Sequence, residues 1–188
     1  MKITLKDGSV LEYSEAKSAA DITKDISMGL FRGATCCKIN GEVTDLRTVI
    51  DSDATLEILT FDDEDGKKTF NHTASHIMAQ AVKRLYPDAK LTIGPAIDNG
   101  FYYDFDVEKS FSPEDLTKIE GEMKKIVKEG LEIERFELPV DEAIKLMEEK
   151  NEPYKVELIQ DLPEGAEISF YDQGGFVDLC AGPHLMRS

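Results

Sequence analysis

A short charged run divides the sequence into two stretches with different hydrophobic patterns. Residues 62–68, Asp-Asp-Glu-Asp-Gly-Lys-Lys, interrupt the periodicity on both sides. Before this run, short alternating segments predict strands, and after it a stripe of apolar residues at helical spacing predicts a long helix. With 188 residues, the chain is long enough for one ordinary domain or two small ones. We therefore predict two domains, 1–61 and 62–188, and the alternative is a long surface loop inside a single domain.

The first stretch is predicted to fold as a small β-grasp (ubiquitin-like) module. Asp7-Gly8 is a typical hairpin turn between two alternating segments. Two strands, one helix and further strands within about 60 residues is the order of elements in that fold. The expected elements, in order, are strands at 2–6 and 10–13, a helix from 18 to about 27, and strands at 34–39 and 55–60.

The second stretch shows the mixed pattern of an α+β domain. Apolar residues with helical spacing run from Phe70 to Tyr86 and stop at Pro87. The segment Ser112-Pro113-Glu114-Asp115 has the cap, the proline and the acids of a helix start, and this helix is expected to end at Gly130. The other expected elements are strands within 92–106 with a tight turn at Asn99-Gly100, a strand at 131–138, a helix at 140–150, and strand-like segments within 168–179.

Composition restricts the partners and the compartment. Residues 1–61 carry 7 basic and 10 acidic side chains, and residues 62–188 carry 15 and 28. Because binding to phosphates needs clustered Lys and Arg, the chain alone is not expected to hold nucleic acid tightly. No apolar stretch reaches the ~20 residues of a membrane span, the first residues lack a secretory signal, and three cysteines make a poor disulfide framework. We predict a cytoplasmic protein without membrane association.

All three histidines lie in two short motifs. His72-Thr-Ala-Ser-His76 places two imidazoles one helical turn apart and away from the apolar stripe, and Cys180-Ala-Gly-Pro-His184 joins a cysteine to a histidine through a turn. Asp178 precedes the second motif and could orient one of its side chains. One such pair alone is commonly a solvated surface feature, but the gathering of every histidine into pairs indicates a site. Three chemistries fit: zinc ligation with an activated water, acid–base catalysis on water without metal, and nucleophilic attack by the cysteine.

Further motifs extend this pattern into a family resemblance. Ile93-Gly94-Pro95, the Gly-Phe-Tyr-Tyr-Asp run at 100–104 and Pro153-Tyr154-Lys155 accompany the histidine motifs. Together these motifs resemble the N-terminal part of bacterial threonyl-tRNA synthetases over essentially the whole chain. Residues 1–61 are similar to the TGS domain of that family, and residues 62–188 to its editing domain, which alanyl-tRNA synthetases share in outline.

The resemblance implies hydrolytic editing of tRNA(Thr) mischarged with serine. Serine lacks one methyl group of threonine, and such a difference changes binding by only ~1–3 kcal/mol, so a second pocket that excludes threonine is needed. Without the resemblance, Lys155 would be interpreted as a solvated lysine and Asp178 as a surface acid at a strand end. The implied roles are positioning of the attacking water or the ribose hydroxyl by His72 or His76, stabilisation of the oxyanion by Lys155, recognition of the seryl amino or hydroxyl group by Asp178, and lining of the pocket by Cys180 and His184.

The resemblance also implies a cofactor and partner assignment. Editing is expected to need no metal, whereas the alanyl type holds zinc with residues equivalent to His72, His76, Cys180 and His184. ATP and zinc are expected only in the catalytic domain, which this chain lacks, so no aminoacylation is expected. The chain ends at Ser188, so the editing domain is expected to be truncated at its C-terminus. Expected partners are serine-charged tRNA(Thr) and the remaining synthetase domains, with a homodimeric full-length enzyme. The alternatives are a freestanding zinc-dependent deacylase of the alanyl type and a non-catalytic interaction module containing a TGS domain.

Overall fold

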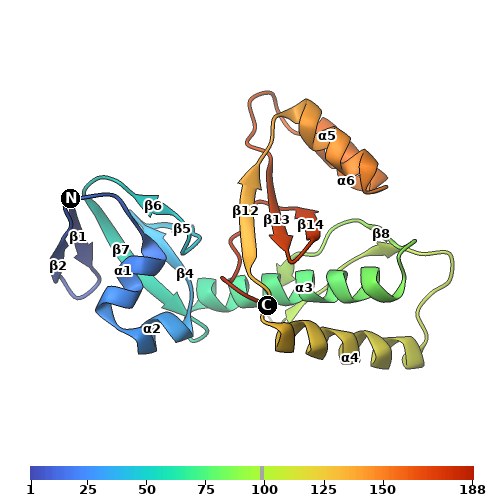
Figure 1. Cartoon of the computed structure of the whole chain (residues 1–188), viewed down its shortest axis with the longest axis horizontal. Coiled ribbons are helices and arrows are strands. Elements are labelled where there is room, and N and C mark those ends of the chain that lie inside the picture. The colour runs from blue at the N-terminus through green and yellow to red at the C-terminus, as the bar shows by residue number, and fades with distance from the viewer. Residues whose placement is uncertain (98–99) are drawn as a thin grey trace. The chain divides into compact units, whose positions relative to one another are not determined.

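The chain divides into two compact units. The structure is a computed structural model, and it describes residues 1–97 and 100–188 (Figure 1). The division lies within the long helix α3 (Glu64–Leu85). The first unit consists of Met1–Asn71 and Gly182–Met186, and the second of His72–Ala181 and Arg187–Ser188.

The first unit contains a five-stranded sheet of order β2-β1-β7-β4-β5. Strands β1 and β7 are parallel, and the other neighbours are antiparallel. Helix α1 packs its Ile22 into the core beside Ile3 and Leu56, so the sheet and helix share one apolar interior. This arrangement confirms the predicted β-grasp fold. The elements are β1 (Lys2–Leu5), β2 (Val10–Glu12), β3 (Lys17–Ser18), α1 (Ala19–Ile26), α2 (Met28–Gly33), β4 (Ala34–Ile39), β5 (Glu42–Thr44), β6 (Val49–Ile50) and β7 (Ala54–Thr60).

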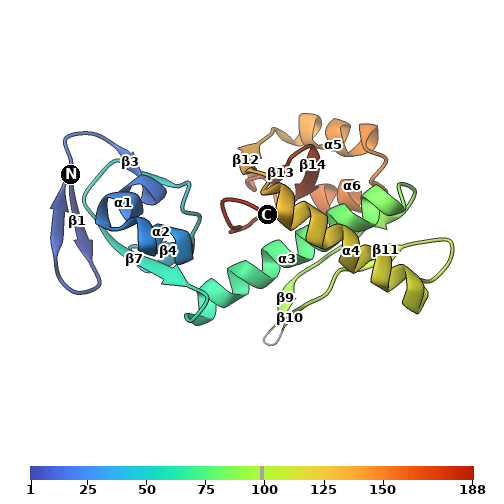
Figure 2. The same cartoon turned by 60° about the horizontal axis from the view of Figure 1, so that its bottom comes forward.

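The second unit has two apolar cores. Helices α3 and α4 lie side by side in both views (Figures 1 and 2), with Ile77 of α3 and Ile126 of α4 in one buried cluster. Helices α5 and α6 cover the antiparallel sheet β12-β13-β14, and Met147 and Phe170 lie in the core between them. The elements are β8 (Lys90–Leu91), β9 (Ala96–Ile97), β10 (Gly100–Phe101), β11 (Phe105–Asp106), α4 (Pro113–Glu129), β12 (Ile133–Glu137), α5 (Val140–Glu149), α6 (Pro153–Gln160), β13 (Ser169–Gln173) and β14 (Phe176–Leu179).

Helix α4 begins and ends at its predicted signals. Ser112 accepts a hydrogen bond from the backbone N–H of Asp115, and the Asp115 carboxylate accepts one from the backbone of Ser112, which completes a capping box. Gly130 ends the helix with φ 60°, a left-handed conformation that glycine adopts readily. The predicted turn at Asn99-Gly100 falls partly on residues 98–99, which lie outside the described residues.

The charged run at residues 62–68, which interrupts the hydrophobic periodicity, is mostly helical in the structure. Helix α3 starts at Glu64, six residues before the expected Phe70. Glu64 lies in the first turn, where the helix dipole favours acidic groups, and pairs at 2.7 Å with Lys68 one turn later. Gly66 lies against the end of β7, because a Cβ atom there would be 1.9 Å from the carbonyl oxygen of Thr60. Polar residues therefore continue the helix outside the apolar stripe that the sequence pattern detects.

Helix α6 is a second difference from the predicted elements. It begins at Pro153, a favourable first residue because proline has no N–H to leave unpaired. At 8 residues, or about two turns, it is too short for hydrophobic periodicity to reveal. Among residues 1–97 and 100–188, none of the helices is both long and apolar enough to cross a membrane.

Candidate functional site

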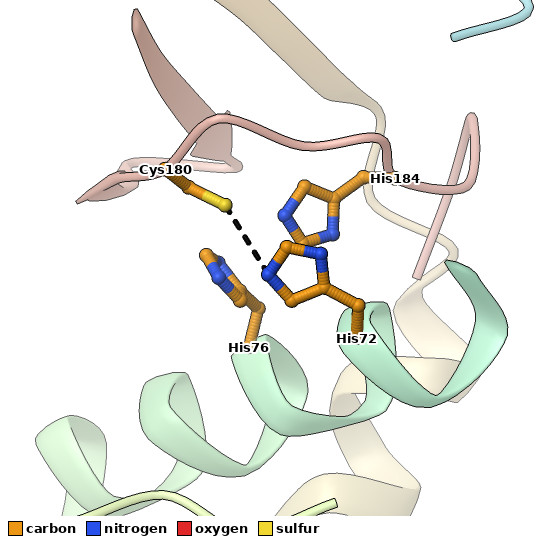
Figure 3. Close-up of side chains that lie close together, drawn as sticks. All are labelled: His72, His76, Cys180 and His184. Atoms are coloured by element: carbon orange, nitrogen blue, oxygen red, sulfur yellow. Dashed lines mark hydrogen bonds between the residues drawn. The ribbon is translucent and has the colours of Figure 1, made fainter. Parts of the chain in front are cut away.

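The structure brings the residues of the two histidine motifs together (Figure 3). One nitrogen or sulfur atom of each side chain lies within 4.8 Å of the others in the set His72, His76, Cys180 and His184. The ring centroids of His72 and His76 are 5.2 Å apart, and the Cys180 Sγ is 3.2 Å from the His72 Nε2, within hydrogen-bonding distance. His76 is 6% exposed and therefore buried, so the interpretation of this pair as solvated surface histidines is wrong.

Local structure explains how these side chains are held. His72 and His76 are four residues apart on α3, so their rings project from the same side of the helix. Cys180 follows β14 directly and remains tied to β13: its N–H donates to the Ser169 carbonyl at 3.1 Å, and the Ser169 hydroxyl donates to its carbonyl at 2.6 Å. The thiol is thus fixed by the sheet and the imidazoles by the helix.

The backbone around His184 is anchored separately, inside the first unit. The Arg47 guanidinium donates to the carbonyl of His184 at 3.2 Å and to that of Leu185 at 2.6 Å. The same guanidinium pairs with Asp45 at 2.5 Å, and the His184 N–H lies 3.4 Å from that carboxylate. Gly182 adopts φ 75°, which suits the turned backbone predicted for this motif.

A buried ion pair lies next to the histidines. The Lys155 ammonium is 2.8 Å from the Asp178 carboxylate, and the two side chains are 4% and 1% exposed. Tyr103 donates its hydroxyl to the Asp178 Oδ2 at 2.6 Å, and the His76 Nε2 is 3.9 Å from the same oxygen. The interpretations of Lys155 as a solvated lysine and of Asp178 as a surface acid are therefore wrong.

Burial and these charges set the protonation states. Burial lowers the pKa of His76 to about 3, although the Asp178 charge acts in the opposite direction, so this imidazole is neutral near pH 7. Burial opposes ionisation of Asp178, but the charge of Lys155 and the hydrogen bonds from Lys155 and Tyr103 outweigh it and hold the pKa of Asp178 below its usual range. Burial and the Asp178 charge raise the pKa of Tyr103. The site therefore holds a neutral imidazole beside an ionised carboxylate and a phenol that stays a hydrogen-bond donor.

Comparisons with known proteins place this chain. The TGS domain family model matches residues 1–60. The threonine–tRNA ligases of Acetivibrio thermocellus, Clostridium tetani and Clostridium acetobutylicum are 67%, 66% and 64% identical to the chain over 185 residues, which is 98% of its length. The chain is therefore similar to the N-terminal region of threonine–tRNA ligases over almost its whole length. It spans 29% of the length of these curated relatives.

This similarity confirms the resemblance to threonyl-tRNA synthetases, and the TGS family model confirms the TGS assignment that the motifs predicted. The four-residue donor set nevertheless also fits a metal. Zinc binds imidazole and thiolate at about 2.0–2.3 Å, which places tetrahedral ligand atoms roughly 3.3–3.8 Å apart. Donor atoms that lie within 4.8 Å of one another could reach that spacing with small side-chain rotations. The geometry is therefore compatible with both a metal-bound and a metal-free site.

Sequence reasoning missed two residues that support the site. Tyr103 lies in the Gly-Phe-Tyr-Tyr-Asp run, but the sequence does not show which aromatic side chain turns inward. Glu152 is 3% exposed, accepts the Leu91 N–H at 2.8 Å and pairs with Lys83 at 2.7 Å. Because Glu152 directly precedes α6, these contacts fix the turn that carries Lys155. The sequence signal that could have identified Glu152 is its position as a polar residue directly before a helix that starts with proline.

Proposed function

We propose that this chain hydrolyses the ester bond of tRNA(Thr) mischarged with serine. The observation that carries the proposal is the placement of His72, His76 and Cys180 beside the buried Lys155–Asp178 pair, in a chain related to threonine–tRNA ligases. A ligase that activates threonine faces serine as a smaller competitor. Because one methyl group provides only ~1–3 kcal/mol of discrimination, a second, hydrolytic pocket is required to reach higher accuracy.

The proposed reaction is attack by water on the aminoacyl ester. A water oxygen adds to the carbonyl carbon, the bond from that carbon to the ribose oxygen breaks, and the proton lost by water is returned to the ribose oxygen. Neutral His76 accepts a hydrogen bond from this water or from the neighbouring ribose hydroxyl, and His72 is the second candidate for that role. Such an ester is already activated, so positioning supplies much of the rate gain.

The Lys155–Asp178 pair has the proposed role of recognising the seryl group and its developing charge. Asp178 accepts a hydrogen bond from the seryl amino or hydroxyl group, and Lys155 places positive charge near the oxyanion. At 1% exposure, the Asp178 carboxylate is enclosed by the side chains of the site. Cys180 and His184 line the remaining wall, with the thiol held next to the His72 ring.

We further propose that the reaction needs no bound metal. Lys155 already provides a cation at the site, and the chain is similar to threonine–tRNA ligases. If zinc did bind, the ligands would be His72, His76, Cys180 and His184, and it would supply an activated water. The proposed tRNA partner is held mainly by the other domains of the ligase, because residues 62–188 carry 28 acidic and 15 basic side chains.

The test is to incubate the chain with Ser-tRNA(Thr), Thr-tRNA(Thr) and Ser-tRNA(Ala), with and without a chelator, and to follow loss of the ester. Selective loss from Ser-tRNA(Thr) that is insensitive to the chelator is expected, together with a metal content near zero. Chelator-sensitive loss from Ser-tRNA(Ala) would instead identify a zinc-dependent deacylase of the alanyl type. Stability of all three esters would overturn the proposal for this chain and favour the interaction-module alternative.

A further inference from the structure

Gly94 lies directly opposite Tyr103 in a short antiparallel arrangement. The Asp104 N–H donates to the Ile93 carbonyl at 2.8 Å, and the Tyr102 N–H donates to the Pro95 carbonyl at 3.4 Å. Because residue 93 pairs with 104 and residue 95 with 102, Gly94 and Tyr103 face each other across the two arms. The pairing of the two arms thus decides which aromatic residue of the Gly-Phe-Tyr-Tyr-Asp run lies over the glycine.

The ring of Tyr103 occupies the space that a side chain at position 94 would need. A Cβ atom on Gly94 would lie 2.0 Å from the Tyr103 Cδ2 and 2.6 Å from its Cε2. An aromatic ring that covers a cross-strand glycine is a recognised stabilising pair in sheets. The ring also stacks on Phe105, with centroids 4.9 Å apart, so it cannot move aside freely. Any side chain at position 94 would therefore displace the phenol.

Ser75 connects this loop to the helix that carries the histidines. The serine is fully buried, and its hydroxyl lies 2.8 Å from the carbonyl oxygen of Gly94 and 2.7 Å from that of His72. One hydroxyl hydrogen is thus shared between the two carbonyl groups. Ser75 is the fourth residue of the His-Thr-Ala-Ser-His motif and has no part in the proposed chemistry.

We propose that Ser75 and Gly94 are positioning residues, which together hold the Tyr103 hydroxyl at the Asp178 carboxylate. The contacts form a continuous series from Ser75 through Gly94 and Tyr103 to Asp178, where the hydroxyl donates at 2.6 Å. Asp178 in turn holds Lys155 at 2.8 Å. The catalytic relevance of this series rests on the proposed editing function, whereas its effect on Tyr103 does not.

A kinetic cycle tests whether Gly94 acts through the Tyr103 hydroxyl. Gly94→Ala and Tyr103→Phe should each lower kcat for Ser-tRNA(Thr) at least about 10-fold with little change in KM, because both remove a hydrogen bond to a buried charge. In the Tyr103→Phe background, Gly94→Ala should cause little further loss, since the hydroxyl on which it acts is already absent. The matched control is Gly121→Ala on α4, where a Cβ atom meets nothing within 4 Å, and it should leave kcat unchanged.

Ser75→Ala gives a milder version of the same test, because it removes one hydroxyl without adding atoms to a buried space. It should lower kcat in the wild-type background and have little effect in the Tyr103→Phe background. If the fold-loss of kcat in the Gly94→Ala/Tyr103→Phe double variant equals the product of the two single losses, the inference is overturned. The two substitutions would then act independently, as in a general loss of folding. A Gly94→Ala enzyme as active as the Gly121→Ala control would also overturn it.

An NMR measurement separates this inference from the proposed function. A tyrosine hydroxyl that is buried and bonded to a carboxylate exchanges slowly with water, so its proton should be visible in the wild type and in Gly121→Ala. Tyr103→Phe assigns the resonance by its loss, and Gly94→Ala should also remove it. If the resonance persists in Gly94→Ala, the positioning role is wrong. If the wild type hydrolyses no ester but Gly94→Ala still removes the resonance, the proposed function fails and the positioning of Tyr103 stands.

Discussion

Replacement of Lys155 by methionine tests how strongly the buried ion pair determines the stability of the second unit. The Lys155 and Asp178 side chains are 4% and 1% exposed and lie 2.8 Å apart. Methionine keeps the length of the apolar stem but removes the ammonium, so Asp178 retains a buried charge without its cation. Loss of one partner of a buried ion pair costs about 3–5 kcal/mol. With a denaturant dependence of about 2 kcal/mol per molar urea, the urea midpoint should fall by roughly 1.5–2.5 M.

Two further variants separate this effect from a general loss of packing. Lys124→Met on α4 is the matched control, because that lysine is 74% exposed and its pairing with Glu120 should contribute less than about 1 kcal/mol. The double variant Lys155→Met/Asp178→Asn should recover much of the stability, since an amide leaves no unpaired charge. Unfolding is followed by circular dichroism and by amide exchange in the second unit. A loss for Lys155→Met no larger than that of the control, or a double variant no more stable than the single one, would refute the reasoning.

Acid, loop anchoring and helix capping give three smaller tests. Burial lowers the pKa of His76 to about 3, against 6.5 for a free imidazole. Between pH 3 and pH 6.5 the unfolded chain therefore binds a proton that the folded chain does not, and the unfolding free energy falls as the pH drops below about 6.5. His76→Gln should flatten this dependence in urea titrations between pH 6.5 and 4; an unchanged slope contradicts it. Arg47→Ala should speed amide exchange in Gly182–Met186, because two carbonyl groups there lose their donor; equal rates contradict it. Ser112→Ala should cost about 1 kcal/mol of unfolding free energy, measured in urea, because the cap of α4 is lost; no loss contradicts it.

Capping residues predicted the ends of a helix correctly where those ends depend only on neighbouring backbone groups. Helix α4 begins at the Ser112 cap and ends at Gly130, because both signals act through backbone groups a few residues away. The start of α3 was not predicted, because its first turns are held by an ion pair and by the close approach of Gly66 to β7 rather than by an apolar face. Helix α6 was missed for a related reason, since the long-range contacts of Glu152 fix its start.

The sequence predicted which residues form the candidate site, but it did not predict that they are buried. The spacing of His72 and His76 shows that they share a helix face, whatever the tertiary structure. The burial of His76 depends on tertiary packing. Asp178 accepts its hydrogen bond from Tyr103, 75 residues earlier in the sequence. No local sequence pattern reports either contact. Lys155 was predicted as a site residue from family motifs alone and Asp178 also from its place before the Cys180 motif, but their direct pairing was not foreseen.

For the proposed editing reaction, the electrostatic arrangement accounts for how an acidic unit would hold an ester. Residues 62–188 carry 28 acidic and 15 basic side chains, and their field repels phosphates. Within the site, however, Asp178 is matched by Lys155 and His76 is neutral, so the group has no net charge. Salt screens exposed charges beyond about 10 Å, while buried pairs are screened much less. The local pair therefore dominates over the surface charge at the ester. In the proposed reaction, an acid at position 178 without its lysine would add to the repulsion of the developing oxyanion, so the proposal requires the two residues to act together.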